Sequence, residues 1–306
     1  MDKHKKELET QLPDIKFNEP LRKYCTFQIG GPADYFYQLK DMEALPSIVQ
    51  FCRANKIPLF IFGAGSNILF NDKGFRGFVI KIEANKIEFD MKNNRVKADA
   101  GVLVSKLINE SIKKGLSGFE KWIGLPGTIG GAVRGNAGCN GLEAKDILIF
   151  ATLMDQKTGI THEANIKYFH FDYRYSKIKL TKEIVLNATF QLKPRRISEE
   201  KQKEIMDKIR SERAQKQPYG LTTGSFFKNP LPHRPAGMLI EEAGLKGKMI
   251  GNAQISEKHA NFFLNKGGAT AKDIIGLMKL AKKTVKSKFG LVLEEEVQIV
   301  PEKIRK

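Results

Sequence analysis

Apolar side chains recur at helical spacing in several parts of the chain. In residues 43–55, Leu45, Ile48, Val49 and Cys52 stand three or four positions apart, which places them on one face of a helix. The first twenty residues also begin with a short helical stretch, followed by a connector. The same spacing predicts further helices over residues 103–114, 197–217, 235–243 and 271–288.

Short apolar runs bounded by turn residues predict strands. The run from Pro58 to Phe62 reads PLFIF and leads directly into Gly63. A run of this length is typical of a buried strand. The other expected strands cover residues 33–39, 76–82, 86–90, 95–99, 147–154, 184–192, 250–255, 261–264 and 292–300. Short, unevenly spaced strands mixed with helices indicate an α+β fold rather than one doubly wound sheet.

A change of composition divides the chain. Residues 197–217 read ISEEKQKEIMDKIRSERAQKQ, a charged helical stretch that Pro218 stops. We interpret it as a bridge between two domains, and 306 residues are enough to give each a buried core. The predicted organisation is an N-terminal helix and connector over 1–20, a first domain with two subdomains over 21–195, and a second domain over 196–306.

The balance of charge is strongly basic. The chain carries 52 Lys and Arg residues against 34 Asp and Glu, a formal net charge of +18. Such chains often bind nucleic acid, but a nucleic-acid binder usually gathers its charge into a patch or tail. Here the basic residues are spread along the whole sequence, with no run of five. The spread favours a solvated lysine-rich surface, with mild attraction for polyanionic small ligands, over a nucleic-acid partner.

Cysteine and histidine patterns indicate neither a disulfide framework nor a metal site. The three cysteines are odd in number and none forms a CxxC pair, and no two of the five histidines stand at HxH or HxxxH spacing. The opening residues, MDKHKKELET, lack the apolar segment of a signal peptide, and no apolar run approaches the ~20 residues that span a membrane. We therefore expect a cytoplasmic protein with reduced thiols and no membrane partner.

Two glycine-rich segments are suited to holding phosphate. Residues 63–67 read GAGSN directly after a predicted strand, and residues 124–132 read GLPGTIGGA. Glycine lets backbone N–H groups approach an anion without a side-chain clash. Neither segment matches GxGxxG or GxxxxGK[ST], so neither a nicotinamide-type Rossmann fold nor a P-loop is indicated. Each segment alone is more typical of tight turns, whereas the two together make a phosphate-bearing cofactor an equally good explanation.

Two polar residues stand among aromatic ones. Arg174 lies in FDYRYS, where its guanidinium can clamp a carboxylate or, alternatively, form a structural pair with Asp172. Ser225 lies in GSFFKNP, where its hydroxyl can donate a proton in an apolar pocket or simply belong to a turn. The chain has no GxSxG elbow, so a hydrolase nucleophile is not indicated.

An acidic triplet precedes the last predicted strand. If residues 296–299 are extended, Val297 and Ile299 face the core, and Glu296 and Gln298 point to the opposite face. Glu296 is then placed where a cleft could form. The alternative is a solvated acidic start to the strand.

Six motifs in order resemble one family. They are TFQIGGPA at 26–33, GAGSN at 63–67, GLPGTIGG at 124–131 with NAG at 136–138, GSFFKNP at 224–230, KHANF at 258–262 and the closing segment 293–299. Together they resemble the UDP-N-acetylenolpyruvoylglucosamine reductase (MurB) family over nearly the whole chain, from about residue 21 to residue 300.

The resemblance implies an α+β fold in which an FAD-binding domain of the vanillyl-alcohol-oxidase (PCMH) type precedes a smaller α+β substrate-binding domain. The short span from Arg174 to Ser225 is similar to family members that lack an extra substrate-covering loop. The residues that match the family's flavin loops, and are expected to bind FAD, are Gly63, Ala64, Gly65, Ser66, Asn67, Gly127, Thr128, Gly130, Gly131 and Asn136.

The activity that the resemblance implies is NADPH-dependent reduction of UDP-N-acetylglucosamine enolpyruvate to UDP-N-acetylmuramate, a step of peptidoglycan precursor synthesis. Separately, we expect the protein to be a monomer. NADPH reduces FAD, and a hydride then passes to the vinyl carbon of the substrate. By the motif match, Arg174 and Glu296 stabilise the negative charge that builds beside the carboxylate, and Ser225 donates the proton. The residues expected to contact the substrate are Arg213, Lys228 and Asn229.

The second flavin loop departs from the family pattern at Arg134, Gly135, Cys139 and Asn140, so its flavin contacts are left open. Three other interpretations compete with the reductase. Another FAD oxidoreductase of the same fold, such as an aldonolactone or alcohol oxidase, would not need the motifs of Ser225 and Glu296. A nucleic-acid-binding protein would carry no chromophore. A degenerate flavoprotein would not need to keep Arg174, Ser225 and Glu296.

Overall fold

The computed structural model describes residues His4 to Lys303. Within that range the chain forms two compact units, each of which gathers segments distant in sequence. The first unit contains the described residues up to Ile15, with Tyr37–Ala64 and Ile80–Glu212. The second contains Lys16–Phe36, Gly65–Val79 and the described residues from Arg213 onward.

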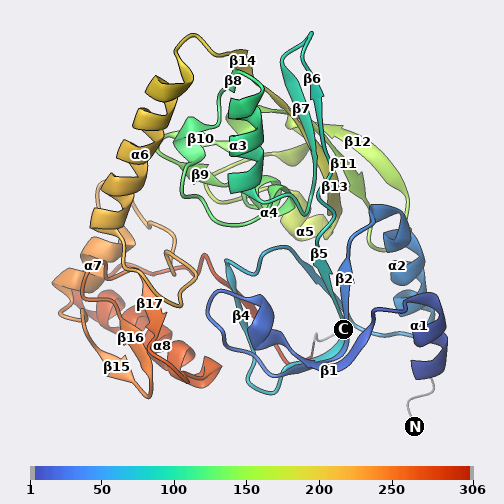
Figure 1. Cartoon of the computed structure of the whole chain (residues 1–306). Helices are drawn as coiled ribbons and strands as arrows, with labels where there is room; N and C mark the ends of the chain where they lie inside the picture. Colours follow the sequence, from blue (N-terminus) through green and yellow to red (C-terminus); the bar gives the residue numbers. More distant parts are fainter. Residues whose placement is uncertain (1–3, 304–306) are drawn as a thin grey trace. The chain divides into compact units, whose positions relative to one another are not determined.

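A five-stranded antiparallel sheet organises the first unit (Figure 1). Buried alanines from three neighbouring strands, Ala98, Ala151 and Ala188, lie in register across its centre. The short helix α4 (Ile129–Gly135) packs against β13, the middle strand of these three. In the order β12-β11-β13-β7-β6, the strands are β12 (Thr161–Asn165), β11 (Leu148–Met154), β13 (Ile184–Gln191), β7 (Arg95–Asp99) and β6 (Ile87–Asp90).

Helices and short strand pairs complete the first unit. Helix α3 (Val104–Lys113) buries Leu107 and Ile108 on one face, as its apolar spacing predicts. The unit also contains an aromatic cluster, in which the rings of Phe119 and Phe190 meet edge to face with their centres 5.5 Å apart. The remaining elements are α1 (Lys5–Gln11), α2 (Leu45–Ala54), α5 (Ile178–Thr181), β3 (Leu59–Phe62), β8 (Leu116–Ser117) with β14 (Lys193–Pro194), and β9 (Gly138–Cys139) with β10 (Leu142–Glu143).

The second unit packs helices on a small antiparallel sheet. Helix α8 (Ala271–Phe289) lies along the sheet of β15, β16 and β17, and α7 (Ala236–Glu242) contacts α8 (Figure 1). The ring of Phe226 stacks on that of Phe263, 4.5 Å away, at the centre of the buried core. The strands of this unit are β15 (Met249–Ile250), β16 (Ala253–Ile255), β17 (Phe263–Asn265), β1 (Lys16–Pro20), β4 (Ile68–Phe70) and β18 (Gln298–Val300).

Three elements run from one unit into the other along the chain: β2 (Pro32–Leu39), β5 (Phe75–Ile82) and α6 (Glu199–Lys216). Single 3₁₀ turns connect other elements, at Leu21–Tyr24, Met42–Ala44, Glu120–Trp122, Ala144–Asp146 and Ile166–Phe169. No helix among residues 4–303 combines the length and apolar character needed to cross a membrane.

The structure also contains short elements that were not expected, among them α5 and β12. Three further differences from the sequence-based expectation concern the connector, the second glycine-rich segment and the closing strand. The connector before residue 20 contains β1, which pairs antiparallel with β2. The second glycine-rich segment contains helix α4, which was not expected. The closing strand is only Gln298–Val300, and Ile299 is 36 % exposed rather than facing the core.

The shortened strand has a physical cause. The Lys228 N–H donates to Glu294 O and the Glu296 N–H donates to Phe226 O, so residues 294–296 follow the segment 226–228. From Gln298 the chain pairs instead with β4, in parallel. This change of partner breaks the simple alternation of inward and outward side chains.

Candidate active site

The two glycine-rich segments meet in the first unit at Gly63. A Cβ built on Gly63 would lie 2.2 Å from Oγ1 of Thr128 and 2.9 Å from its Cγ2. The close approach leaves no space for any side chain at position 63, and Thr128 itself is buried. The sequence predicted that both segments serve one cofactor, and the structure brings these two positions into contact.

The end of the first loop lies in the second unit. Gly65 has a φ of +66°, and a Cβ there would lie 2.3 Å from Tyr24 O. Thr26 N–H donates to Gly65 O over 3.2 Å, which links this loop to the motif TFQIGGPA. Among the described residues, the N–H groups of Ala64, Gly65 and Ser66 have no hydrogen-bond acceptor. A glycine loop with free N–H donors fits a phosphate-bearing group such as the pyrophosphate of FAD.

The glycines of the second loop have different surroundings. Gly127 has a φ of +110°, which a residue with a side chain rarely adopts. Gly130 donates its N–H to Ala100 O over 2.9 Å, and a Cβ there would lie 2.8 Å from that of Ala100. Gly131 is exposed. Gly127 and Gly130 therefore set the course of the backbone, and Gly131 presents backbone at the surface.

Asn136 is fully buried, with a left-handed backbone at the end of α4. Its Nδ2 donates to Glu143 Oε2 over 2.9 Å and to Asp172 O over 3.0 Å, and its Oδ1 accepts from Lys145 N–H. The amide thus links the second glycine loop to the segment that carries Arg174. Direct contact of Asn136 with FAD stays a prediction.

Arg174 lies in a tight turn closed by the bridge between Asp172 and Tyr175, and its φ is +53°. Its Nη2 donates to Gly138 O over 3.2 Å, and its guanidinium carbon lies 5.3 Å from the centre of the Tyr173 ring. Because these contacts fix the half-buried guanidinium beside the second glycine loop, it is a preorganised positive charge of the first unit.

Ser225 and Glu296 lie on adjacent segments of the second unit. Ser225 forms a β-bridge with Phe262, and the next residue, Phe226, accepts the N–H of Glu296 over 2.9 Å. Asn67, at the end of the first glycine loop, donates its Nδ2 to Glu296 O over 3.0 Å. Three segments predicted separately, a flavin loop, a proton donor and a catalytic carboxylate, therefore converge here.

The other two members of the acidic triplet have basic partners. Lys228 Nζ lies 3.2 Å from Glu294 Oε2, and Lys282 Nζ lies 2.7 Å from Glu295 Oε1. The triplet is therefore not three equivalent solvated carboxylates. Lys228, predicted to bind substrate, is only partly exposed and already has an anionic partner.

The other two predicted substrate residues are Asn229, a loop residue whose side chain reaches the start of a helix, and Arg213, near the end of a helix. Asn229 accepts the N–H of Ala236 through its Oδ1 over 3.1 Å, at the start of α7. Arg213 is half-buried near the end of α6, and Ala214 O beside it accepts Lys258 Nζ over 2.7 Å. The motif KHANF, to which sequence reasoning gave no chemical role, therefore contacts this end of α6.

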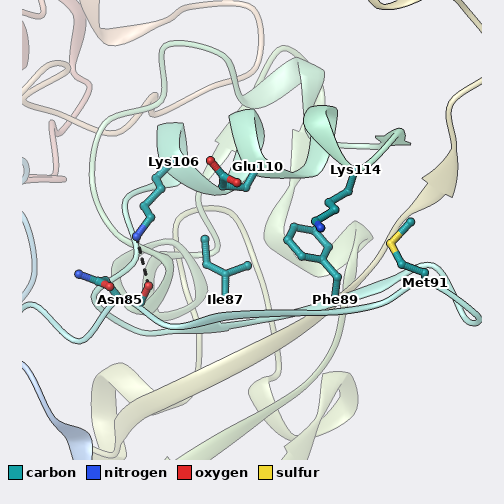
Figure 2. Close-up of a pocket in the computed structure, with 7 residues that line it drawn as sticks. All are labelled: Asn85, Ile87, Phe89, Met91, Lys106, Glu110 and Lys114. Atoms are coloured by element: carbon teal, nitrogen blue, oxygen red, sulfur yellow. Dashed lines mark hydrogen bonds between the residues drawn. The ribbon is translucent and has the colours of Figure 1, made fainter.

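A surface groove elsewhere in the first unit is lined by none of these residues. It encloses about 510 Å³ between β6 and α3, with Ile87, Phe89 and Met91 on one side and Lys106 and Lys114 on the other (Figure 2). Lys106 Nζ donates to Asn85 O across its end over 3.3 Å. The groove is an open surface feature, separate from the loops described above.

Known protein families match both parts of the chain, and one of them binds FAD, as the glycine loops suggest. The model of the UDP-N-acetylenolpyruvoylglucosamine reductase C-terminal domain matches residues 216–300, and an FAD binding domain model matches residues 33–165. The UDP-N-acetylenolpyruvoylglucosamine reductase of Clostridioides difficile is 41% identical over 290 residues, which are 94% of each chain. The chain belongs to the UDP-N-acetylenolpyruvoylglucosamine reductase (MurB) family.

Other members of the MurB family are similarly close. The reductase of Listeria monocytogenes serotype 4a is 41% identical over 300 residues, 96% of this chain and 98% of the relative. The crystal structure of MurB from Thermus caldophilus superposes with a TM-score of 0.78 at 33% identity, covering 94% of this chain and 98% of that one. The MurB family assignment confirms the predicted fold class: a PCMH-type FAD-binding domain, then the MurB C-terminal domain, in the short form of about 300 residues.

The contact between the two loops gives a first testable prediction. Replacing Gly63 with alanine places a Cβ within 2.2 Å of Thr128 Oγ1, so the loops must separate. We expect a loss of about 1–3 kcal/mol in the free energy of unfolding, and weaker FAD binding measured by fluorescence titration. Gly135→Ala is the matched control for the stability measurement, because a Cβ at this helical position meets no atom within 4 Å. Equal FAD affinity in Gly63→Ala and wild type would contradict the prediction.

Proposed function

We propose that the chain reduces the enolpyruvyl ether of UDP-N-acetylglucosamine to UDP-N-acetylmuramate, with NADPH as hydride donor and FAD as cofactor. The observation that carries the proposal is the convergence of Asn67, Ser225 and Glu296 in the second unit through the contacts of Phe226 O and Glu296 O. An FAD oxidase acting on an alcohol or lactone has no need of this arrangement, because its substrate receives no proton at carbon.

The residues that would hold FAD are those of the two glycine loops. Gly63 and Thr128 are in contact, and the N–H groups of Ala64, Gly65 and Ser66 have no acceptor among the described residues, as an incoming phosphate requires. Bound FAD supplies the transfer of a hydride from NADPH to the vinyl carbon of the substrate. The chain supplies the rest: orientation of the substrate, stabilisation of charge and a proton.

Charge and proton are assigned to three side chains. Hydride addition to the terminal vinyl carbon leaves an electron pair on the carbon beside the carboxylate, which then takes one proton. We assign that proton to the Ser225 hydroxyl, and we assign stabilisation of the enolate-like charge to Arg174 and Glu296. Arg174 is held by Gly138 O, and Glu296 by Phe226 O and Asn67. Arg213, Lys228 and Asn229 are proposed to bind the diphosphate or carboxylate.

We further propose that the enzyme acts as a monomer in the cytoplasm. Every residue given a role belongs to one chain, so the chemistry does not require a second copy. Cys25 and Cys52 are buried free thiols, which fits a reducing compartment. Size-exclusion chromatography with light scattering at micromolar concentration should give the mass of one chain, and a stable dimer would contradict this part of the proposal.

The absorption spectrum of the purified protein tests the proposed function. We expect a flavin band in the visible region that bleaches when NADPH is added anaerobically and returns when the UDP-enolpyruvyl sugar follows. A protein that stays colourless after incubation with FAD would refute the proposal. A band that bleaches but does not return with the sugar would instead favour another FAD oxidoreductase of the same fold.

A further inference from the structure

Asn261, in the motif KHANF, is buried at 2 % exposure beside the Ser225 segment. Its Nδ2 donates to Phe227 O over 2.8 Å, and its Oδ1 accepts the N–H of Phe227 over 2.9 Å. Its own backbone O accepts the N–H of Phe226 over 2.7 Å. One residue therefore satisfies three backbone groups directly after Ser225, as a neighbouring strand would.

The surroundings make these hydrogen bonds hard to replace. Phe226 and Phe227 are 0 % and 1 % exposed, and both lie in the core cluster with Phe263. Water cannot reach the backbone of Phe227 there, so without the amide its N–H and C=O would be buried and unsatisfied. The segment would have to move to recover partners, and Ser225 is attached to it.

The same segment also holds Glu296. Phe226 accepts the Glu296 N–H, while Ser225 forms a bridge with Phe262. If the Asn261 amide were lost and the segment of residues 225–227 moved, the Ser225 hydroxyl would change its position relative to the Glu296 backbone. Glu296 keeps a second contact, to Asn67, so Ser225 is the more sensitive of the two.

Asn261 is itself held by a preorganised turn. The N–H groups of Lys258 and His259 both donate to Ser256 Oγ, and His259 Nδ1 accepts the N–H of Asn261 over 3.2 Å. Burial lowers the pKa of His259, which keeps its ring neutral near pH 7 and its Nδ1 able to accept. The Asn261 amide that binds the Phe227 backbone is therefore itself held in place by this turn.

We propose that Asn261 is a positioning residue for the proton donor, which sets the reach of the Ser225 hydroxyl by fixing the register of residues 225–227. The proposal rests on the proposed function, because it assigns Asn261 an effect on proton delivery and none on flavin reduction. It predicts that loss of the Asn261 amide slows proton delivery because it displaces the Ser225 hydroxyl.

A double-mutant cycle tests the proposal. The measured rates are bleaching of bound FAD by NADPH and its recolouring by the UDP-enolpyruvyl sugar, for wild type, Asn261→Ala, Ser225→Ala and the double variant. We expect Asn261→Ala to slow recolouring by about 10- to 100-fold and to leave bleaching within about twofold. In the Ser225→Ala background the same change should slow recolouring by less than about threefold, because coupled residues are not additive.

A matched variant separates positioning from loss of stability. Val285→Ala opens the same core at a fully buried position without removing a hydrogen bond. It should lower the melting temperature by several degrees, as Asn261→Ala does, while its recolouring rate stays near that of wild type. If Asn261→Ala does not fold, Asn261→Ser keeps a small polar group at the site and enters the cycle in its place.

The outcomes are distinct. An equal slowing by Asn261→Ala in both backgrounds would overturn the proposal, as would an equal slowing of bleaching and recolouring, because either result marks a merely structural role. If wild type itself is not recoloured by the sugar, the proposed function fails before any variant is compared. If wild type is recoloured but Ser225→Ala is too, at the normal rate, only the role of Ser225 and its positioning residue fails.

Discussion

Ser225→Ala is expected to slow reduction of the UDP-enolpyruvyl sugar by about a thousandfold, which is typical of the loss of a positioned acid. That factor corresponds to about 4 kcal/mol of barrier. The structure supports a specific loss, because the backbone of residues 225–227 is held by Phe262 and by Asn261 rather than by the serine hydroxyl. Stopped-flow absorbance should show bleaching by NADPH at the wild-type rate and slow recolouring by the sugar.

Thr284→Ala provides the control for Ser225→Ala. Thr284 also carries a partly buried hydroxyl in the second unit, and its Oγ1 donates to Leu280 O within α8. Its removal should leave both rates near those of wild type. Normal recolouring in Ser225→Ala would remove the serine from the mechanism.

Glu296→Gln is expected to lower turnover by about 10²- to 10³-fold, the usual effect of removing a group that stabilises transition-state charge. The substitution keeps the shape of the side chain and both backbone contacts, from Glu296 N–H to Phe226 O and from Asn67 Nδ2 to Glu296 O. The flavin content should therefore be unchanged. Steady-state turnover and the ratio of visible to 280 nm absorbance measure the two quantities.

The neighbouring carboxylate offers a matched control. Glu295 Oε1 lies 2.7 Å from Lys282 Nζ, in a partly exposed pair. Such a pair contributes at most about 1 kcal/mol to stability, so Glu295→Gln should retain nearly full turnover. Equal losses in the two glutamine variants would indicate a general effect of charge on this segment, and a loss of flavin in Glu296→Gln would make Glu296 structural.

The long periodic elements were predictable because local pattern and tertiary packing agree. Helix α3 buries the face that its spacing indicates. Helix α8 is capped at its N-terminus by Thr270, whose side chain accepts the N–H of Asp273. Helix α4 was missed because its sequence, IGGAVRG, is rich in glycine, the poorest helix former after proline. Tertiary contacts fix it instead: its first residues donate to Val102 O and Ala100 O.

The candidate site was predictable where glycine is required by geometry. Gly63 and Gly65 stand out in the sequence, and each lies against a neighbouring atom that excludes a side chain. Buried asparagines give no such signal. Asn136 was predicted to contact the cofactor, and the structure shows that its amide donates hydrogen bonds to Glu143 and Asp172. Asn261 was given no role, because its hydrogen-bond partner Phe227 is 34 positions away in the sequence. Contacts between residues so far apart cannot be predicted from one sequence.

The pairing of β4 with β18 has a consequence for biosynthesis. The Asn67 side chain, next to β4, cannot form its hydrogen bond with Glu296 until that residue, 229 positions later, has been translated. At a ribosomal rate of roughly 5–20 residues per second, the wait lasts roughly 10–45 seconds. All three residues of β4 are buried in the finished fold, so the nascent chain exposes an apolar, unpaired edge for that time. A chaperone that holds the N-terminal part of the chain during elongation should therefore raise the yield of folded protein, and fragments that end before residue 298 should aggregate.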